Sequence, residues 1–283
     1  MSAMSQMSLM NYALELDRIS CEFLSNSNQY EIYTAVGDTT LNVGQGEFVS
    51  VVGPTGCGKS TLLNVAAGLL KPSKGQVRVF GQPLNGLNTK AGYMFQAESL
   101  LPWRTALQNV MLGLEYHDIS QKSAHELSMD WLSRVGLNRF ADHYIHQLSG
   151  GMRKRVSLAQ TLVLDPDIIL MDEPLSALDI QTRQLMENEI LDIWSKQKKA
   201  VLFITHDLDE AIAMSDRVVV LSAGPATHPI GDFVIDLPRP RNVAEIRHDP
   251  SYIHLHEQIW TVLRDEVLKG YRQQLSPKGE TIS

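Results

Sequence analysis

Residues 48–60 read FVSVVGPTGCGKS, an apolar run followed by a glycine-rich turn and a lysine-serine pair. The turn fits the pattern G-x-x-x-x-G-K-[ST], in which backbone N–H groups curl inward and bind phosphate oxygens. It also stands after a predicted strand and before a predicted helix, whose N-terminus attracts anions. The sequence therefore predicts a phosphate-binding loop made of Gly53, Pro54, Thr55, Gly56, Cys57, Gly58, Lys59, Ser60 and Thr61.

Two side chains of this loop have expected roles of their own. Lys59 supplies a positive charge for the β- and γ-phosphates of a nucleotide, and the Ser60 hydroxyl is the expected ligand of Mg²⁺. Cys57 is interpreted as a small loop residue without a redox role.

A second predicted site follows the buried strand IILM at 168–171, which ends in Asp172 and Glu173. In parallel sheets, nucleotides bind outside the carboxyl ends of the strands. Adjacent strand residues point to opposite faces, so the two acids need different roles. We expect Asp172 to hold Mg²⁺, through water, and Glu173 to orient or deprotonate an attacking water. The alternative for such a pair alone is a helix cap.

Short predicted strands alternate with helical stretches along most of the chain. Apolar runs at 48–52, 168–171, 200–205 and 217–221 are separated by helical patterns, which favours an α/β fold with a mostly parallel sheet covered on both faces. Residues 75–84 alternate and predict a hairpin at the sheet edge. Longer helical patterns over about 98–165 indicate a helical block inserted into this core.

Further motifs stand in a fixed order around these two sites. LSGGM at 148–152 precedes the acidic strand, GYMFQ ends in Gln96, SALD ends in Asp179, and FITHDLDEA contains His206. Together with the phosphate loop, they resemble the ATP-binding-cassette (ABC) ATPases over residues 13–222. The resemblance implies a P-loop NTPase core with an antiparallel β subdomain and the inserted α-helical subdomain. It divides the chain into an ATPase domain at 13–224, with the helical subdomain at about 98–165, and a C-terminal extension at 225–283.

The resemblance also implies a mechanism. Two subunits pack head to tail, and each ATP lies between one phosphate loop and the partner's Ser149, Gly150 and Gly151, where a helix N-terminus converges on the γ-phosphate. Gln96 is expected to sense Mg²⁺ and the attacking water, and His206 to contact the γ-phosphate. The implied cofactors are ATP and Mg²⁺, with Lys59, Gln96, Glu173 and His206 as catalytic residues, Ser60, Gln96 and Asp172 at the metal, and Asp179 at the nucleotide.

Two positions need separate comment: the aromatic that stacks on adenine and the fifth residue of the signature motif. An adenine-stacking aromatic precedes the phosphate loop in this family, and Phe23, after ISCE, matches best, with Tyr30 and Tyr33 as alternatives. Met152 occupies the position where many members have glutamine. Because Ser149, Gly150 and Gly151 are intact, we expect activity to be retained.

Composition bounds the class of protein. The 283 residues are 43% hydrophobic and 20% charged and carry a net charge of −7, which favours a globular protein and disfavours a general nucleic-acid binder. Apolar runs are strand-sized, and the N-terminal stretch lacks a basic leader, so we expect neither a membrane span nor a secretory signal. Two cysteines fit a reducing compartment.

An ABC ATPase without a membrane span acts on another chain. AESLLPWRTALQNV at 97–110 places Trp103 at the start of the helical block, where it suits docking by a permease helix, although core packing is the alternative for part of this segment. This stretch, with IDLPRPR at 235–241, resembles the nitrate/sulfonate/taurine branch of bacterial importers. We therefore expect a homodimer on the cytoplasmic face of the membrane, bound to two permease subunits. An external solute-binding protein is expected to deliver the solute to these subunits. An exporter ATPase is the first alternative, and a non-transport ABC protein acting on nucleic acid or ribosomes is the second, which the acidic charge disfavours.

The residues after Gly224 differ from the core. Five prolines between 225 and 250 suggest an extended run over the surface, followed by a helix over 250–269 with an apolar stripe. We expect the stripe to dock on the protein's own core, with a partner surface as the alternative.

Overall fold

The computed structural model describes residues 12–24 and 32–275. Its larger sheet has six strands in the order β10-β9-β3-β8-β7-β6, all parallel except β10, which runs antiparallel to β9. The strands span Phe48–Val52 (β3), Ala91–Met94 (β6), Ile168–Asp172 (β7), Ala200–Ile204 (β8), Arg217–Leu221 (β9) and Pro229–Val234 (β10). Strands β3, β7 and β8 are buried at every residue, as expected for a parallel sheet covered on both faces.

A second sheet of four strands is antiparallel throughout, in the order β2-β1-β4-β5. Its strands span Tyr12–Leu24 (β1), Ile32–Gly44 (β2), Lys74–Val79 (β4) and Gln82–Pro83 (β5). The expected hairpin at 75–84 is confirmed as β4 and β5.

The larger sheet has an apolar core on each of its two faces, because neighbouring residues on each strand point to opposite faces. Ile168 and Leu170 join α1 (Lys59–Ala66) and the antiparallel sheet, so α1 packs between the two sheets. Ile169 and Met171 face the other way, toward the helices that cover the second face. These helices are α5 (Ile180–Gln197), α6 (Leu208–Met214), α7 (Val243–Ile246) and α8 (Pro250–Leu275).

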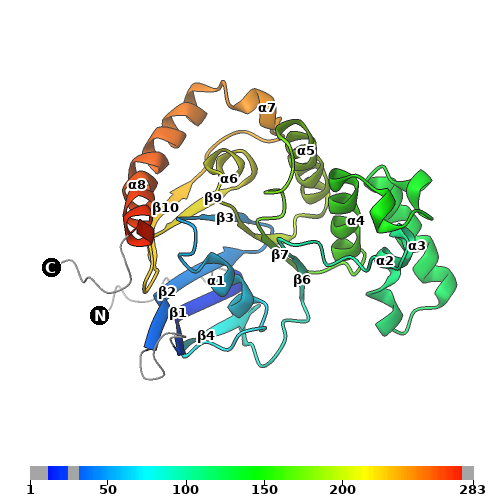
Figure 1. Ribbon diagram of the computed structural model, residues 1–283, viewed down its shortest axis with the longest axis horizontal. Helices are drawn as coiled ribbons and strands as arrows, with labels where there is room; N and C mark the ends of the chain where they lie inside the picture. The colour runs from blue at the N-terminus through cyan, green and yellow to red at the C-terminus, as the bar shows by residue number, and fades with distance from the viewer. Residues whose placement is uncertain (1–11, 25–31, 276–283) are drawn as a thin grey trace, which may run out of the picture.

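The segment between β6 and β7 is helical and lies to one side of the sheets (Figure 1). Its elements are α2 (Ala106–Met111), η1 (Leu114–Tyr116), α3 (Gln121–Arg134), η2 (Asn138–Phe140), η3 (Ile145–Gln147) and α4 (Gly150–Leu162). Thr105, Ser120 and Ser149 cap α2, α3 and α4, each accepting a hydrogen bond from a backbone N–H in the first turn. The expected helical insertion into an α/β core is thereby observed.

The chain after Gly224 adds to this core. Strand β10 pairs with β9, and α8 runs to Leu275, six residues past the expected end at 269. Tyr252, Ile259 and Leu263 of α8 are buried in the same core as α6, as predicted for the apolar stripe. In Figure 1, α8 lies on the side of the molecule opposite the helical segment. The division into domains at residue 224 stays a prediction.

Within 12–24 and 32–275, every helix is too short or too polar to cross a bilayer.

Candidate nucleotide site

The phosphate loop connects the buried strand β3 to helix α1. Gly58 caps α1 with φ at 111°, and Gly56 has φ at 78°, both in the left-handed region that favours glycine. A side chain at Gly58 would also place its Cβ 3.2 Å from the Ala35 carbonyl oxygen on β2. The sequence pattern therefore has a steric basis here, because the loop passes the second sheet too closely for a larger residue.

Lys59 closes the loop from within. Its ammonium donates hydrogen bonds of 2.9 Å to the carbonyl oxygens of both Gly53 and Pro54, and the residue is 5% exposed. These bonds fix the position of the Lys59 ammonium near the N-terminus of α1. A fixed positive charge beside free N–H groups is an arrangement that binds anions.

The loop is tied to the acidic strand by a side-chain hydrogen bond. Ser60 Oγ donates to Asp172 Oδ1 across 3.0 Å, and burial raises the pKa of the Asp172 carboxyl above its usual range. Tyr93 on β6 lies beside this pair: its hydroxyl donates to Asn64 Oδ1 at 3.1 Å, and burial next to Asp172 raises the pKa of the phenol. Sequence reasoning missed Tyr93 and Asn64; the only available signal was that Tyr93 precedes Gln96 on a strand beside β7.

Glu173 is held by bonds to residues at the ends of two other strands, β6 and β8, or just after them. Its Oε2 lies 2.9 Å from His206 Nδ1 and 3.4 Å from Gln96 Nε2, and its backbone N–H donates to the carbonyl of Ile204. Its φ of 42° lies in the left-handed region, which costs about 1 kcal/mol or more for a residue with a side chain. The surrounding bonds thus hold a strained backbone, and the carboxylate, histidine and amide meet at one point.

These groups line one open cavity of about 430 Å³ at the carboxyl ends of the parallel strands. It brings together nine of the residues predicted from the sequence: Thr55, Gly56, Gly58, Lys59, Ser60, Thr61, Gln96, Glu173 and His206. Asp172 lies behind Ser60, and Gly53, Pro54 and Cys57 form the rest of the loop. The cavity offers a cation, backbone N–H groups and a carboxylate, which is the equipment for binding and cleaving a phosphoanhydride.

Comparison with known proteins identifies the family. Residues 36–176 match the sequence description of the ABC transporter family. The chain is 44% identical over 264 residues to an uncharacterized ABC transporter ATP-binding protein of Methanocaldococcus jannaschii, covering 93% of this chain and 96% of that protein. The chain belongs to the ABC transporter family. It is accordingly an ATP-binding subunit and an ABC ATPase.

Two further ABC proteins are similar to this chain, one in sequence and one in fold. A taurine import ATP-binding protein of Yersinia pestis is 43% identical over 239 residues, covering 82% of this chain and 92% of that protein. The resemblance to the taurine branch is thereby confirmed. The fold matches an ATP-binding cassette solved as a dimer in a post-hydrolysis state with ADP and phosphate, with a TM-score of 0.70, 31% identity, and coverage of 80% of this chain and 100% of that chain.

The ABC signature residues lie away from the cavity of their own chain. Within the described residues, Ser149, Gly150 and Gly151 do not line it. Ser149 caps α4 by accepting a hydrogen bond from the Met152 N–H, and a Cβ at Gly151 would meet Thr182 of α5 at 2.6 Å. Asp179 caps α5, where hydrogen bonds from Thr182 and its neighbours lower the pKa of the Asp179 carboxyl. The start of α4, with the signature motif, therefore lies against the first turn of α5, which Asp179 caps; we call these two helix starts one ridge.

The adenine candidates lie at the end of the β1–β2 ladder. Phe23 and Tyr33 are register partners, 40% and 44% exposed, so both offer an aromatic face. The Tyr33 hydroxyl lies 3.5 Å from where a Cβ on Gly224 would be, close to the phosphate loop. Tyr30 lies outside the described residues. The choice among these aromatics stays a prediction.

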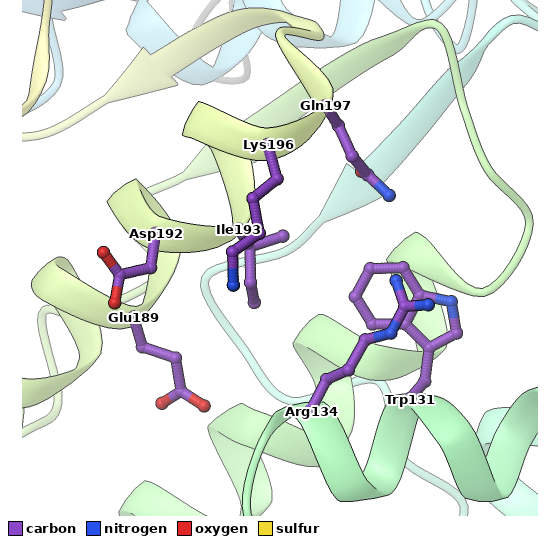
Figure 2. A pocket seen from close by; sticks show the side chains of 7 residues that line it. All are labelled: Trp131, Arg134, Glu189, Asp192, Ile193, Lys196 and Gln197. Atoms are coloured by element: carbon purple, nitrogen blue, oxygen red, sulfur yellow. The ribbon is translucent and has the colours of Figure 1, made fainter.

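A second cavity, of about 440 Å³, lies between α3 and α5 (Figure 2). Arg134 stacks on Trp131 at 4.7 Å on one wall, and Glu189, Asp192 and Lys196 project from the other. This cavity has side chains of both charges and no phosphate loop. It is therefore not the candidate site for the nucleotide. Elsewhere in the described chain, too, no three His, Cys, Asp or Glu residues form a metal cluster.

Proposed function

We propose that this chain is the ATP-hydrolysing subunit of an importer that takes up a small solute of the nitrate, sulfonate or taurine type through a separate permease. The observation that carries the proposal is the convergence of the phosphate loop, Gln96, Glu173 and His206 on one cavity. The taurine import relative supports the direction of transport and the solute class.

The phosphate loop is the proposed site for the nucleotide triphosphate. Loop N–H groups and the Lys59 ammonium bind its β- and γ-phosphates, and Phe23 stacks on adenine. Mg²⁺, when bound, neutralises phosphate charge. The Ser60 and Asp172 oxygens fit this hard cation because both are oxygen donors and already lie 3.0 Å apart, and Gln96 lines the same cavity as Ser60.

Glu173 is the proposed residue that orients the attacking water and accepts its proton. Because the carboxylate accepts the bond from His206 Nδ1, the imidazole Nε2 is left for the γ-phosphate, to which it would donate a hydrogen bond when the ring carries both protons. Gln96 holds the other side of Glu173 at 3.4 Å, so a shift of either partner changes where the carboxylate points.

We propose that two copies form a head-to-tail dimer around ATP. The Ser149 side chain is exposed at the N-terminus of α4, and among residues 12–24 and 32–275 it serves as the cap of that helix alone. It would complete the phosphate site of the partner. Asp179 on the same ridge would lie at the same interface. The relative solved as a dimer with ADP and phosphate supports this arrangement.

The permease is proposed to dock at Trp103, which is 70% exposed. Asn109 is fully buried and bonds four backbone groups, at Leu101, Arg104 and Thr105, fixing the loop that presents the indole. Leu100, in contrast, packs into the core, so part of the predicted docking segment has the structural role given as its alternative. A rigid, exposed tryptophan after Gln96 suits a partner that responds to nucleotide.

Membrane fractionation tests the proposal. The chain should be recovered with membranes only when its permease is co-expressed, on the cytoplasmic face, and the purified complex should couple ATP hydrolysis to uptake of a small anion or zwitterion from an external binding protein. Outward transport of a solute by that complex would favour the exporter alternative. Recovery with ribosomes or nucleic acid would contradict the proposal.

A further inference from the structure

Three consecutive basic residues follow the signature motif on α4, and each bonds a different residue outside that helix. Arg153 Nε lies 2.6 Å from Glu98 Oε2, and Lys154 Nζ donates to the backbone carbonyl of Gln96 at 2.8 Å. Arg155 Nε lies 3.2 Å from Glu189 Oε2 on α5, at the wall of the cavity in Figure 2. Two of the three side chains thus bind the segment that starts at Gln96.

Lys154 is the unusual member of this triplet. It is 2% exposed, and burial lowers the pKa of its ammonium. Burying an ammonium is costly unless its donors find acceptors, so the bond to the Gln96 carbonyl has structural weight. The carboxylate of Glu98, held by Arg153, adds a favourable charge nearby.

These bonds give Gln96 two different attachments. Its side chain reaches Glu173 inside the nucleotide cavity, while its carbonyl is bound to α4. Ser149 caps the same helix five residues before Lys154, within little more than one helical turn. Because a helical turn moves as a rigid unit, displacement of Ser149 is transmitted to the backbone of Gln96.

We propose that Lys154, assisted by Arg153, is a positioning residue that couples the two ATP sites of the dimer, since it joins Gln96 of one site to the Ser149 that completes the other. This inference rests on the head-to-tail dimer proposed above. Engagement of Ser149 with the partner's nucleotide pulls on Gln96, which then sets Glu173 for hydrolysis in its own site. Because coupling is reciprocal, the same bond holds Ser149 of that protomer against the partner's nucleotide, so each active site depends on Lys154 of both protomers.

A heterodimer with one silent site tests the coupling. When one protomer carries Glu173→Gln, the remaining active site takes Gln96 from the intact protomer and Ser149 from the altered one. Lys154→Met is placed in either protomer, so that it stands beside the active site's Gln96 or beside its Ser149. We expect turnover to fall about tenfold in both placements, as for loss of one charge-assisted hydrogen bond, with the Kd for ATP unchanged.

Matched variants separate coupling from general damage. Lys122→Met, on the exposed face of α3, should leave turnover unchanged in both placements, and Lys154→Arg should restore most of it. Should Lys154→Met not fold, Glu98→Gln, at a partly exposed position, gives the same comparison with a smaller fall. A fall in one placement only, or in neither, overturns the coupling. The reference is the heterodimer that carries Glu173→Gln in one protomer and no other change. If this heterodimer does not form, or hydrolyses no ATP, the proposed dimer is wrong and the coupling with it.

Discussion

His206 and Glu173 are joined by a side-chain contact of 2.9 Å between Nδ1 and Oε2, although they follow different strands of the sheet. Parallel pairing of β7 with β8 brings the ends of these strands together, because Asp172 is in register with Ile204. The contact fixes the direction of the carboxylate and, by making Nδ1 the donor, the tautomer of the imidazole. In the proposed mechanism, hydrolysis therefore depends on a carboxylate that is positioned before a water arrives.

Replacing that carboxylate separates binding from turnover. Glu173→Gln keeps the shape of the side chain but removes the base, so ATP hydrolysis should fall about 100-fold or more while the Kd for ATP changes little. Light scattering with ATP should then detect a trapped dimer. Glu126→Gln, on the exposed face of α3, is the control and should behave as wild type. Full hydrolysis by Glu173→Gln would refute the assigned role.

The adenine contact is tested at Phe23 and Tyr33, which face each other across β1 and β2. Truncating a stacking aromatic removes roughly 1–3 kcal/mol, so Phe23→Ala should weaken ATP binding about fivefold to a hundredfold. Calorimetry on the two alanine variants compares them directly, with phosphate-only ligands as the control. A larger loss for Tyr33→Ala than for Phe23→Ala would move the stack to β2.

Docking of the permease is tested at Trp103. Because the indole is exposed and its loop is fixed by Asn109, Trp103→Ala should leave basal ATP hydrolysis within about twofold while binding of the permease weakens about tenfold or more. Pull-down with tagged permease measures this. Leu127→Ala, an exposed apolar residue on α3, is the matched control. Equal recovery of both variants would show that the docking surface lies elsewhere.

Sequence reasoning predicted those features that depend on neighbouring residues. The phosphate loop follows from the backbone angles that Gly56 and Gly58 allow, and the two acids follow from the end of a buried strand. Such short-range constraints leave a pattern in the sequence, so the loop and the two acids can be predicted from the residues themselves. Gln96 and His206 lack such a pattern, and their prediction depends on the resemblance to ABC ATPases.

Contacts between distant segments were not predictable in the same way. Tyr93 reaches Asn64, and Lys154 reaches the Gln96 carbonyl, only because the sheet and the inserted helices bring them together. A lysine on an amphipathic helix is typical of a solvated face, and nothing in its sequence context indicates 2% exposure. Tertiary packing decided these cases.

Stability should depend on pH through Glu187, a fully buried residue of α5. Burial, reinforced by Glu210 and Asp207 and opposed by Arg247 and Arg183, raises its pKa from 4.5 to about 7. The folded state keeps a proton that the unfolded state releases, so stability falls as pH rises from 4.5 to about 7, by roughly 3 kcal/mol at most.

Glu187→Gln removes this dependence. The variant should unfold at higher urea concentration than wild type at pH 8, where wild type must bury a charge, and the advantage should shrink at pH 5. Glu126→Gln, at an exposed position, should follow wild type at both values. A constant difference between Glu187→Gln and wild type across this range would contradict the assignment.

The C-terminal helix contacts the phosphate loop directly. A Cβ at Gly270 of α8 would lie 3.1 Å from Pro54 Cβ, and Glu266 Oε2 accepts a 2.6 Å bond from the Ala223 N–H. Ala223 leads into the segment whose Thr227 hydroxyl donates to the Cys57 carbonyl. Helix α8 therefore supports the loop from outside, at a point where glycine permits close approach.

Gly270→Val should consequently weaken ATP binding. Valine favours a helix more than glycine does, so the helix itself is not weakened, but its branched Cβ forces α8 and Pro54 apart. Crowding of this kind costs about 1 kcal/mol or more, equivalent to about a fivefold higher Kd for ATP, which calorimetry measures. Gln273→Val, at an exposed position one turn later, is the control and should bind ATP as wild type does. Equal affinities for both variants would mean that the loop holds its shape without α8, and that the helix packs there for stability alone.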